Sequence, residues 1–518
     1  MNPTPASTAH ATSEGAALAP AAPVKSSYQQ ILSACMLMGG SSAINIAVSI
    51  VRTKVVAVLL GPAGFGLMGM LSAIADLAHS LASMGINNSG VRQIAEAQAA
   101  GDTERVGRSA AVLRRVAWLL GLSGALLVVV LSAPIARLSF GDERHAGAVA
   151  LLALAVFLRL IASGHAAVLQ GARRIADLAR IGAWGAAVSA VATVLIVFWL
   201  GEAGVAPALV ASAAVQVLIV WHYARRLDIS RVAVAWSDTW RESRPLLQLG
   251  FAFMASGLLM MAASYVVRLI VLHNGGLESA GYFQAAWTLG GLYVGFILGA
   301  MSADFYPRLV GLATQHDQMN QLVNEQTRVS VLLGGPGVIG TLILAPLLVP
   351  MFYSPQFAAA VDVLRWICLG MAVRVVSWPI GYVVIAKNRR ALFVAVDAGW
   401  TALYLALCWT LVGKFGLVGA GISFLLANMF HLVLIAVVAR RLVGFAWSQA
   451  NARLLLAYAA CAALAWIAPY FGSAWAHLMS GAALLLVSGY AVRSLVLLSE
   501  ADLVPWARLR ALLKGQRT

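Results

Sequence analysis

Long apolar stretches separated by short polar gaps run along the chain from about residue 30 to the late 490s. An apolar window of about 20 residues is long enough to cross a bilayer as an α-helix. The pattern therefore predicts an all-α polytopic membrane protein with 14 transmembrane helices. The predicted spans are residues 31–60, 64–89, 111–136, 147–170, 177–200, 204–224, 246–272, 279–303, 329–352, 357–386, 391–412, 416–439, 454–470 and 475–498.

Lys and Arg residues gather in every second gap between these spans. Of the 36 basic residues, only Arg137, Arg144 and Lys414 lie in the intervening gaps. Basic loops stay on the cytoplasmic side of a membrane, so we expect both termini to be cytoplasmic. The net charge of +16 then reflects this asymmetry and predicts no nucleic-acid partner. A soluble protein is excluded because only 11% of the residues are charged and 61% are hydrophobic.

The chain also contains an internal duplication at an offset of about 216 residues. Residues 170–174 align with residues 386–390, and residues 224–226 align with residues 439–441. Each copy holds an even number of spans, which predicts two parallel six-helix repeats, a common plan for transporters. The predicted domains are a disordered cytoplasmic tail at 1–27, an N-lobe at 28–226 with spans 1–6, a C-lobe at 227–441 with spans 7–12, two extra spans at 442–498 and a basic cytoplasmic tail at 499–518.

Six basic residues lie inside the predicted spans, where a charge costs about 2.5–3.5 kcal/mol. Arg159 and Arg374 are equivalent in the two repeats, and so, within one residue, are Arg52 and Arg268. A guanidinium offers parallel donors that suit a phosphate. Five of the six predict a cationic substrate cavity between the lobes, formed by Arg52, Lys54, Arg159, Arg268 and Arg374. Snorkelling to the membrane interface, or pairing with a buried acid, remains the alternative for each residue.

A few other polar residues are candidates for coupling transport to a proton or cation, or for lining the cavity. Asp76 stands alone in an apolar span, where it could carry a coupling proton or cation or pair with an arginine. Asp304 at the end of span 8 matches Asn88 in the first repeat, which indicates that this position requires a polar side chain more than a charged one. The four cysteines lack metal-ligand spacing, so no metal site is predicted.

Several short motifs then resemble a known family. They are residues 60–67 (Leu-Gly-Pro-Ala-Gly-Phe-Gly-Leu), residues 88–91 (Asn-Ser-Gly-Val), residues 306–309 (Tyr-Pro-Arg-Leu) and residues 381–387 (Gly-Tyr-Val-Val-Ile-Ala-Lys). In their sequence and order, these motifs resemble those of Wzx-type flippases of the multidrug/oligosaccharidyl-lipid/polysaccharide exporter superfamily. The resemblance extends over about residues 28–441.

The resemblance implies translocation of an undecaprenyl-diphosphate-linked oligosaccharide from the cytoplasmic to the periplasmic leaflet of a bacterial inner membrane. The glycan would serve O-antigen lipopolysaccharide or another cell-surface polysaccharide. An ion gradient or the membrane potential would drive transport, with no cofactor and no nucleotide hydrolysis. The implied partners are the lipid-linked glycan, membrane lipids, a polysaccharide polymerase and a chain-length regulator.

Such a substrate needs groups that stack on a glycan, and Tyr293, Trp378 and Tyr382 are candidates. The two extra spans depart from many Wzx proteins and resemble the lipid II flippase MurJ, so a MurJ-like role is the near alternative. We expect these spans either to line a groove for the lipid tail or only to pack against one lobe. A multidrug exporter fits less well, because cationic substrates favour an acidic cavity. A membrane-embedded glycan polymerase or other enzyme is not expected, since the sequence lacks Asp-x-Asp, Walker and zinc-protease motifs.

Overall fold

The computed structural model describes residues 27–227, 234–471 and 474–501, and every regular element in these ranges is a helix. The all-α fold is therefore confirmed. Most of the two predicted tails, 1–27 and 499–518, lies outside the described residues. The elements are α1 (Ser27–Ser83), α2 (Ile86–Ala99), α3 (Thr103–Val130), α4 (Ser132–Phe140), α5 (Ala146–Gly171), α6 (Ile175–Leu200), η1 (Gly201–Gly204), α7 (Val205–Ala224), α8 (Trp236–Gly311), α9 (His316–Phe352), η2 (Pro355–Phe357), α10 (Ala360–Ala386), α11 (Arg390–Phe415), α12 (Val418–Val443), α13 (Gln449–Ile467), η3 (Ala468–Phe471) and α14 (Ala474–Ala501).

Ten helical segments of the described chain are long and apolar enough to cross a membrane. Several of them hold more than one helix: α1 is broken at Gly61, α8 is broken at Gly276, and the segment Ile175–Ala224 contains both α6 and α7. In α14 the apolar part is the shorter stretch Gly481–Leu497. The chain is thus a multi-pass membrane protein, and the count of fourteen spans stays a prediction.

The duplication is visible in the backbone as well as in the sequence. Residues with positive φ recur in pairs that lie 215 residues apart: Gly61 and Gly276, Arg173 and Asn388, Gly201 and Gly416. Gly61 has φ 63° and ψ −173°, and Gly276 has φ 72° and ψ −175°. Glycine adopts this conformation without steric cost. At these three pairs of positions the two repeats therefore break their helices in the same way.

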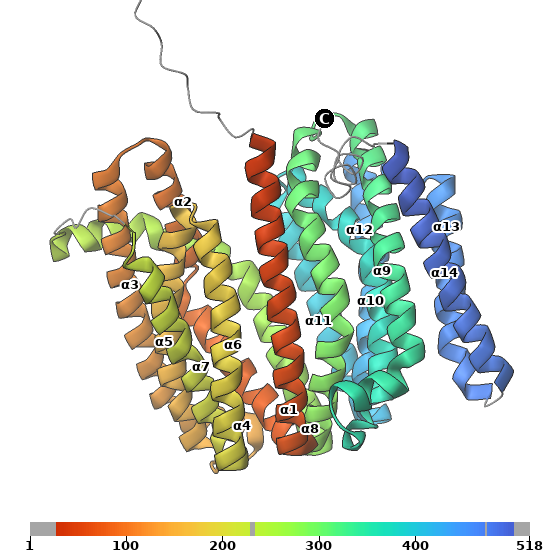
Figure 1. Ribbon diagram of the computed structural model, residues 1–518, viewed down its shortest axis with the longest axis horizontal. Helices are drawn as coiled ribbons and strands as arrows, with labels where there is room; N and C mark the ends of the chain where they lie inside the picture. Colours follow the sequence, from red (N-terminus) through yellow and green to blue (C-terminus); the bar gives the residue numbers. More distant parts are fainter. Residues whose placement is uncertain (1–26, 228–233, 472–473, 502–518) are drawn as a thin grey trace, which may run out of the picture.

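The helices form two bundles that lie side by side (Figure 1). The N-lobe contains α1 to α7, and the C-lobe contains α8 to α12, with the lobes meeting mainly along α1 and α8. The helices α13 and α14, drawn in blue, pack on the outer side of α9. The first turns of α8 are held by the N-lobe, because Arg115 Nη1 donates to Val234 O at 2.6 Å and to Thr239 Oγ1 at 2.9 Å.

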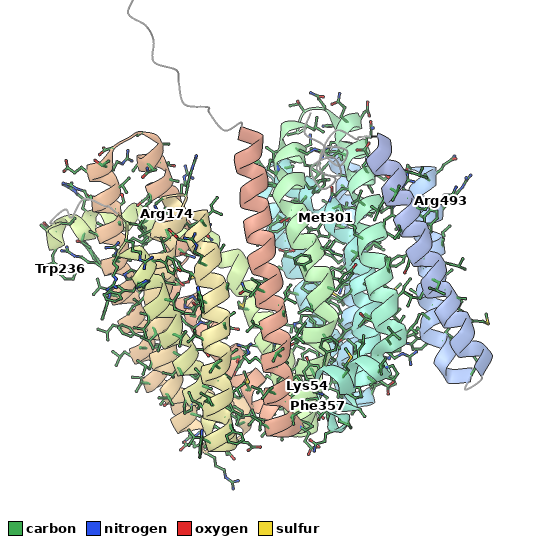
Figure 2. The ribbon with its side chains drawn as sticks, viewed as in Figure 1. Lys54, Arg174, Trp236, Met301, Phe357 and Arg493 are labelled. Atoms are coloured by element: carbon green, nitrogen blue, oxygen red, sulfur yellow. The ribbon has the colours of Figure 1, made fainter. Side chains whose placement is uncertain are left out.

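The two ends of the bundle differ in charge. We call the end that carries Arg174 and Arg493 the basic end, and the end that carries Lys54 and Phe357 the opposite end (Figure 2). At the opposite end, α1 and α8 approach so closely that a Cβ on Gly281 would lie 1.9 Å from Pro62 O. A Cβ on Gly66 would lie 2.1 Å from Leu277 O. Only glycine permits this backbone contact between the lobes.

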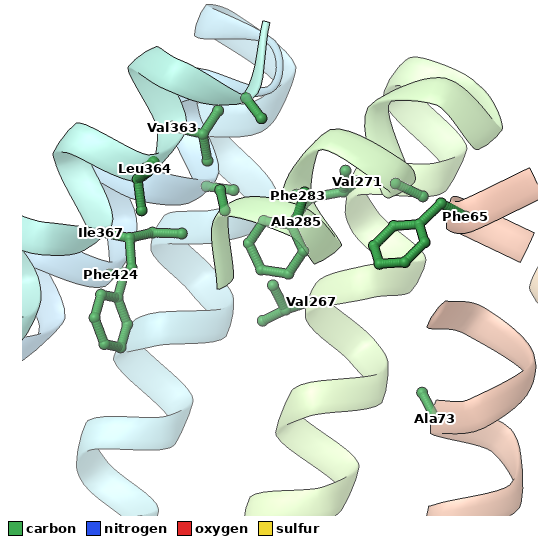
Figure 3. Packing of buried hydrophobic residues seen from close by; sticks show 14 of the residues in the cluster. Phe65, Ala73, Val267, Val271, Phe283, Ala285, Val363, Leu364, Ile367 and Phe424 are labelled. Carbon is green, nitrogen blue, oxygen red and sulfur yellow. The ribbon is translucent and has the colours of Figure 1, made fainter. Parts of the chain in front are cut away.

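An aromatic cluster completes the closure of the opposite end. Phe65 of the N-lobe packs edge-on against Tyr353 and Phe357 of the C-lobe, with ring centroids 5.6 and 5.8 Å apart. The hydroxyl of Tyr353 donates to Ala285 O at 3.1 Å. These residues belong to a core that continues through both lobes, from Phe65 and Ala73 to Ile367 and Phe424 (Figure 3).

Polar contacts fix α13 to the C-lobe. Near the start of α13, Asn451 Nδ2 donates to Asn324 O on α9 at 2.7 Å. Near its end, Arg365 on α10 donates to Trp466 O. Because both ends of α13 are tied to C-lobe helices, we expect α13 to move with that lobe.

Candidate functional site

The C-lobe contains two adjoining cavities between α8, α10, α11 and α12. The large chamber has a volume of about 480 Å³ and the small chamber about 260 Å³. Both belong to one site, because five residues line both of them: Met260, Arg374, Trp378, Tyr382 and Trp400. The large chamber follows α8 from Phe283 towards the basic end as far as Ser302.

Arg268 lines the large chamber. Its Nε donates to Gln284 Oε1 at 3.0 Å, and its Nη1 donates to Ser264 O at 2.9 Å and to the Ser264 hydroxyl. Each of these partners lies on α8 and is neutral. The guanidinium is thus held in a fixed orientation while its positive charge is not cancelled by its hydrogen-bond partners.

Arg374 lines both chambers from the middle of α10. Asp397 on α11 also lines the small chamber and attracts Arg374 electrostatically. No ion pair joins these two residues among the described side chains, in contrast to the direct pair of Arg159 with Asp76. Arg374 is therefore a cation that a ligand in either chamber can reach.

Aromatic side chains make much of the remaining wall. Trp378 and Tyr382 lie edge to face with centroids 4.7 Å apart, and Trp400 and Tyr404 stack with centroids 5.5 Å apart. The Trp400 Nε1 and the Tyr404 hydroxyl are buried without a hydrogen-bond partner in the described protein. A buried polar group without a partner is costly, so these two groups are suited to a polar ligand.

The sequence analysis singled out Arg268, Arg374, Trp378 and Tyr382, and the structure brings these four residues together in one cavity. It missed other lining residues, namely Asp397, Trp400, Tyr404, Asn428 and His431. Asp397, Trp400 and Tyr404 follow one another at helical spacing, which places them on one face of α11. This polar and aromatic face in an otherwise apolar span was the feature of the sequence from which these three residues could have been predicted.

Arg159 lies in the N-lobe on α5 and forms an ion pair with Asp76 on α1. The distance from Arg159 Nη2 to Asp76 Oδ1 is 2.7 Å, and their side chains are 38% and 45% exposed. Asp76 also attracts Arg268 of the C-lobe electrostatically. Of the two roles that the sequence left open for Asp76, the structure shows the pairing with an arginine. A cavity shared by Arg159 and Arg374 stays a prediction, since Arg159 lines neither chamber.

The other two predicted cations lie on α1, away from the chambers. Lys54 Nζ donates to Pro350 O at 2.9 Å and lies at the opposite end (Figure 2). Arg52 is half-buried two residues before it and has no hydrogen bond to another described residue. The structure thus does not bring these two residues together with Arg268 and Arg374.

The remaining candidates lie outside the cavity or cannot be placed. The Tyr293 hydroxyl donates to Leu333 O at 2.7 Å, so its ring packs against α9 and lines neither chamber. Asn88 is exposed on α2. Asp304 lies within α8, but its side chain is outside the described residues. The glycan contact predicted for Tyr293 therefore has no support in this geometry.

Comparisons with known proteins agree with this architecture. Residues 55–362 match the family described as "Polysaccharide biosynthesis protein". The Lipid III flippase of Escherichia coli (strain K12) is 24% identical over 399 residues, covering 76% of this chain and 94% of that protein. Among solved structures, the lipid II flippase MurJ in an inward closed conformation gives a TM-score of 0.67 at 12% identity, over 89% of this chain and 100% of that chain. An inward-facing MATE multidrug resistance transporter of the MOP superfamily gives 0.66 at 15% identity, over 79% and 98%. These structures share the fold of the present chain.

Proposed function

Because the chain belongs to the polysaccharide biosynthesis protein family, we propose that it flips an undecaprenyl-diphosphate-linked oligosaccharide across a bacterial inner membrane. The glycan passes from the cytoplasmic to the periplasmic leaflet, where it serves O-antigen or another surface polysaccharide. The matched Lipid III flippase supports this substrate class. In this role a polysaccharide polymerase and a chain-length regulator receive the product.

The observation that carries the proposal is the pair Arg268 and Arg374 in one aromatic cavity of the C-lobe. A charge inside a membrane protein is costly, so two cations in one cavity indicate a polar or anionic ligand. A diphosphate offers several oxygens to two guanidinium groups. The aromatic wall suits a sugar, because a ring face packs against the apolar face of a pyranose.

The arrangement of the ends fits alternating access. The opposite end is closed by the contact of Gly281 with Pro62 and by the cluster around Phe65. The large chamber extends towards the basic end. We assign the basic end to the cytoplasm on the positive-inside rule, so the closed end faces the periplasm. Loading from the cytoplasmic leaflet follows from this orientation.

The orientation is tested by cysteine labelling. In a cysteine-free background, a cysteine at Asp142 is expected to react with an impermeant maleimide added to intact cells, because residue 142 lies in the turn after α4 at the opposite end. A cysteine at Ala235, just before α8, is expected to react only after the cells are opened. Labelling of position 235 and not of 142 in intact cells would reverse the orientation and reject the assignment.

Lipid II flipping is the second candidate, and α13 and α14 favour it. The MATE structure covers 79% of this chain, whereas the MurJ structure covers 89%. Under either candidate, we propose that α13 and α14 serve the lipid tail, because both are apolar and pack outside the two-lobe core.

A flipping assay with the protein reconstituted in lipid vesicles tests both candidate substrates. The purified protein is placed in vesicles that contain undecaprenyl-diphosphate-linked oligosaccharide, and a glycosidase is added outside. Without protein, the enzyme digests only the outer-leaflet half of the glycan. With the protein, we expect digestion of nearly the whole pool, because inner-leaflet substrate is carried outwards. Digestion that stops at the protein-free level for this lipid and for lipid II would overturn the proposed function.

A further inference from the structure

The small chamber carries a different chemistry from the large one. Its polar residues include a carboxylate, an amide, an imidazole and an indole N–H, whereas the two cations of the large chamber, Arg268 and Arg374, are accompanied mainly by aromatic and apolar residues. The groups that matter are Arg374, Trp378, Asp397, Trp400, Asn428 and His431. They come from α10, α11 and α12, so the chamber exists only in the folded C-lobe.

A carboxylate in this position argues against a second phosphate site. Asp397 would repel an anion placed beside it, since like charges at short range disfavour each other most where water is scarce. The same carboxylate accepts hydrogen bonds from hydroxyl groups. On the shared wall, the guanidinium of Arg374 offers hydrogen-bond donors and no acceptor. A ligand between these two residues must therefore both donate and accept, as a polyhydroxylated ring does.

Two further features match such a ring. The buried Trp400 Nε1 has no hydrogen-bond partner among the described residues, so it can donate to a ligand oxygen. Asn428 is oriented by the hydrogen bond from its Nδ2 to Phe424 O at 2.7 Å, so its amide is held in place at the chamber wall. The indole faces of Trp378 and Trp400 supply apolar surface beside these polar groups.

The size of the chamber limits what it can hold. Its volume of about 260 Å³ lies below the range of about 300–1,000 Å³ that is typical of pockets for drug-sized ligands. It has room for a single sugar ring and not for an oligosaccharide. Its neighbour, at about 480 Å³, shares Arg374 with it. A diphosphate at Arg268 and Arg374 would thus place its attached sugar at the entrance of the small chamber.

We propose that the small chamber is a saccharide site that recognises the first sugar of the lipid-linked glycan through its hydroxyl groups. The inference rests on the proposed function. Asp397 accepts hydrogen bonds from hydroxyls of the sugar, Trp400 Nε1 donates one, and Arg374 contacts both the sugar and the diphosphate. The chamber then makes the carrier selective for the reducing-end sugar, while the rest of the glycan lies in the space outside it.

The test compares lipids that differ only in this sugar. Binding of undecaprenyl diphosphate, and of the same lipid bearing one hexose or one N-acetylhexosamine, is measured on the full-length protein in detergent by native mass spectrometry. The unaltered protein is expected to bind at least one sugar-bearing lipid about tenfold more tightly than the sugar-free lipid, because hydrogen bonds to charged groups such as Asp397 and Arg374 are stronger than those between neutral groups. Asp397→Asn and Trp400→Phe are each expected to remove most of this preference. The preference is measured as the ratio of the affinities for the sugar-bearing and the sugar-free lipid, because Asp397→Asn also removes a charge that repels the diphosphate.

Asp362→Asn is the matched control, because Asp362 is exposed on α10 and lines neither chamber. It should leave all the affinities unchanged. Equal binding of all three lipids by the unaltered protein overturns the saccharide site. So does a parallel loss for sugar-bearing and sugar-free lipids in both variants, which would mean that Asp397 and Trp400 act through Arg374 or the fold. Retention of the full preference by both variants also overturns it. Failure of the unaltered protein to bind any of these lipids would instead reject the proposed function.

Discussion

Replacing Arg374 by alanine is expected to reduce flipping to the protein-free level while the protein still inserts into the membrane. Arg374 lines both chambers and is not joined to a carboxylate by an ion pair among the described residues. Its removal would leave the diphosphate facing Asp397 with one cation fewer. Losing a charge-assisted contact in such a site costs at least about tenfold in affinity. Arg374→Lys should restore only part of the rate, because an ammonium lacks the planar fork of donors.

The measurement is glycosidase access in the reconstituted vesicles, with protein content and monodispersity checked for each variant. Arg389→Ala is a suitable control, because Arg389 is exposed in the turn before α11 at the basic end. It should flip at the unaltered rate. A normal rate for Arg374→Ala would show that the C-lobe cavity does not hold the diphosphate, and the proposed site would then be wrong.

Replacing Gly281 by alanine is expected to open the closed end of the carrier and to slow flipping at least about tenfold. A methyl group at this position would meet Pro62 O at 1.9 Å, and Pro62 belongs to the facing lobe. The contact is with backbone and not with a flexible side chain, so the two lobes must separate. Overpacking of this kind costs about 1–3 kcal/mol, and it acts only on the state in which the opposite end is closed. The conformational equilibrium therefore shifts away from that state.

The shift in the conformational equilibrium is measured by the reactivity of a cysteine introduced at Ser354, a buried residue between α9 and η2 at the opposite end. In a cysteine-free background this reporter is expected to react faster with an impermeant maleimide when Gly281 is alanine. Gly257→Ala is the control on the same helix, since a Cβ there has nothing within 4 Å. If Gly281→Ala leaves both the labelling and the flipping rate unchanged, the contact between α1 and α8 is not a gate.

Much of the architecture could be predicted because it depends on local properties of the chain. Helix length and hydropathy gave the all-α membrane fold, and the places where helices break follow from single residues such as Gly61 and Gly276. Span boundaries were less accurate where helices run past the apolar part. For example, α8 begins at Trp236, ten residues before the predicted span, because its first turns pack on the N-lobe through Arg115.

The candidate site was only partly predictable. A charged residue in an apolar span can be recognised in the sequence as a candidate, so Arg268 and Arg374 were identified before the structure. An aromatic residue cannot be recognised in this way, because a tryptophan in a membrane helix packs against protein or lipid more often than it contacts a ligand. Trp400 and Tyr404 became candidates only when the structure showed their polar atoms buried without partners beside the cavity.

The sequence by itself determined the class of protein, the duplication and the set of charged residues inside the apolar spans, since each of these depends only on residue type and spacing. Only the tertiary structure decided how those charges differ. Arg159 and Arg374 occupy equivalent positions in the two repeats, yet Arg159 is paired with Asp76 from α1 while Arg374 lines two chambers. Ion pairing depends on distances of a few ångströms between side chains on different helices. Those distances are set by how the helices pack.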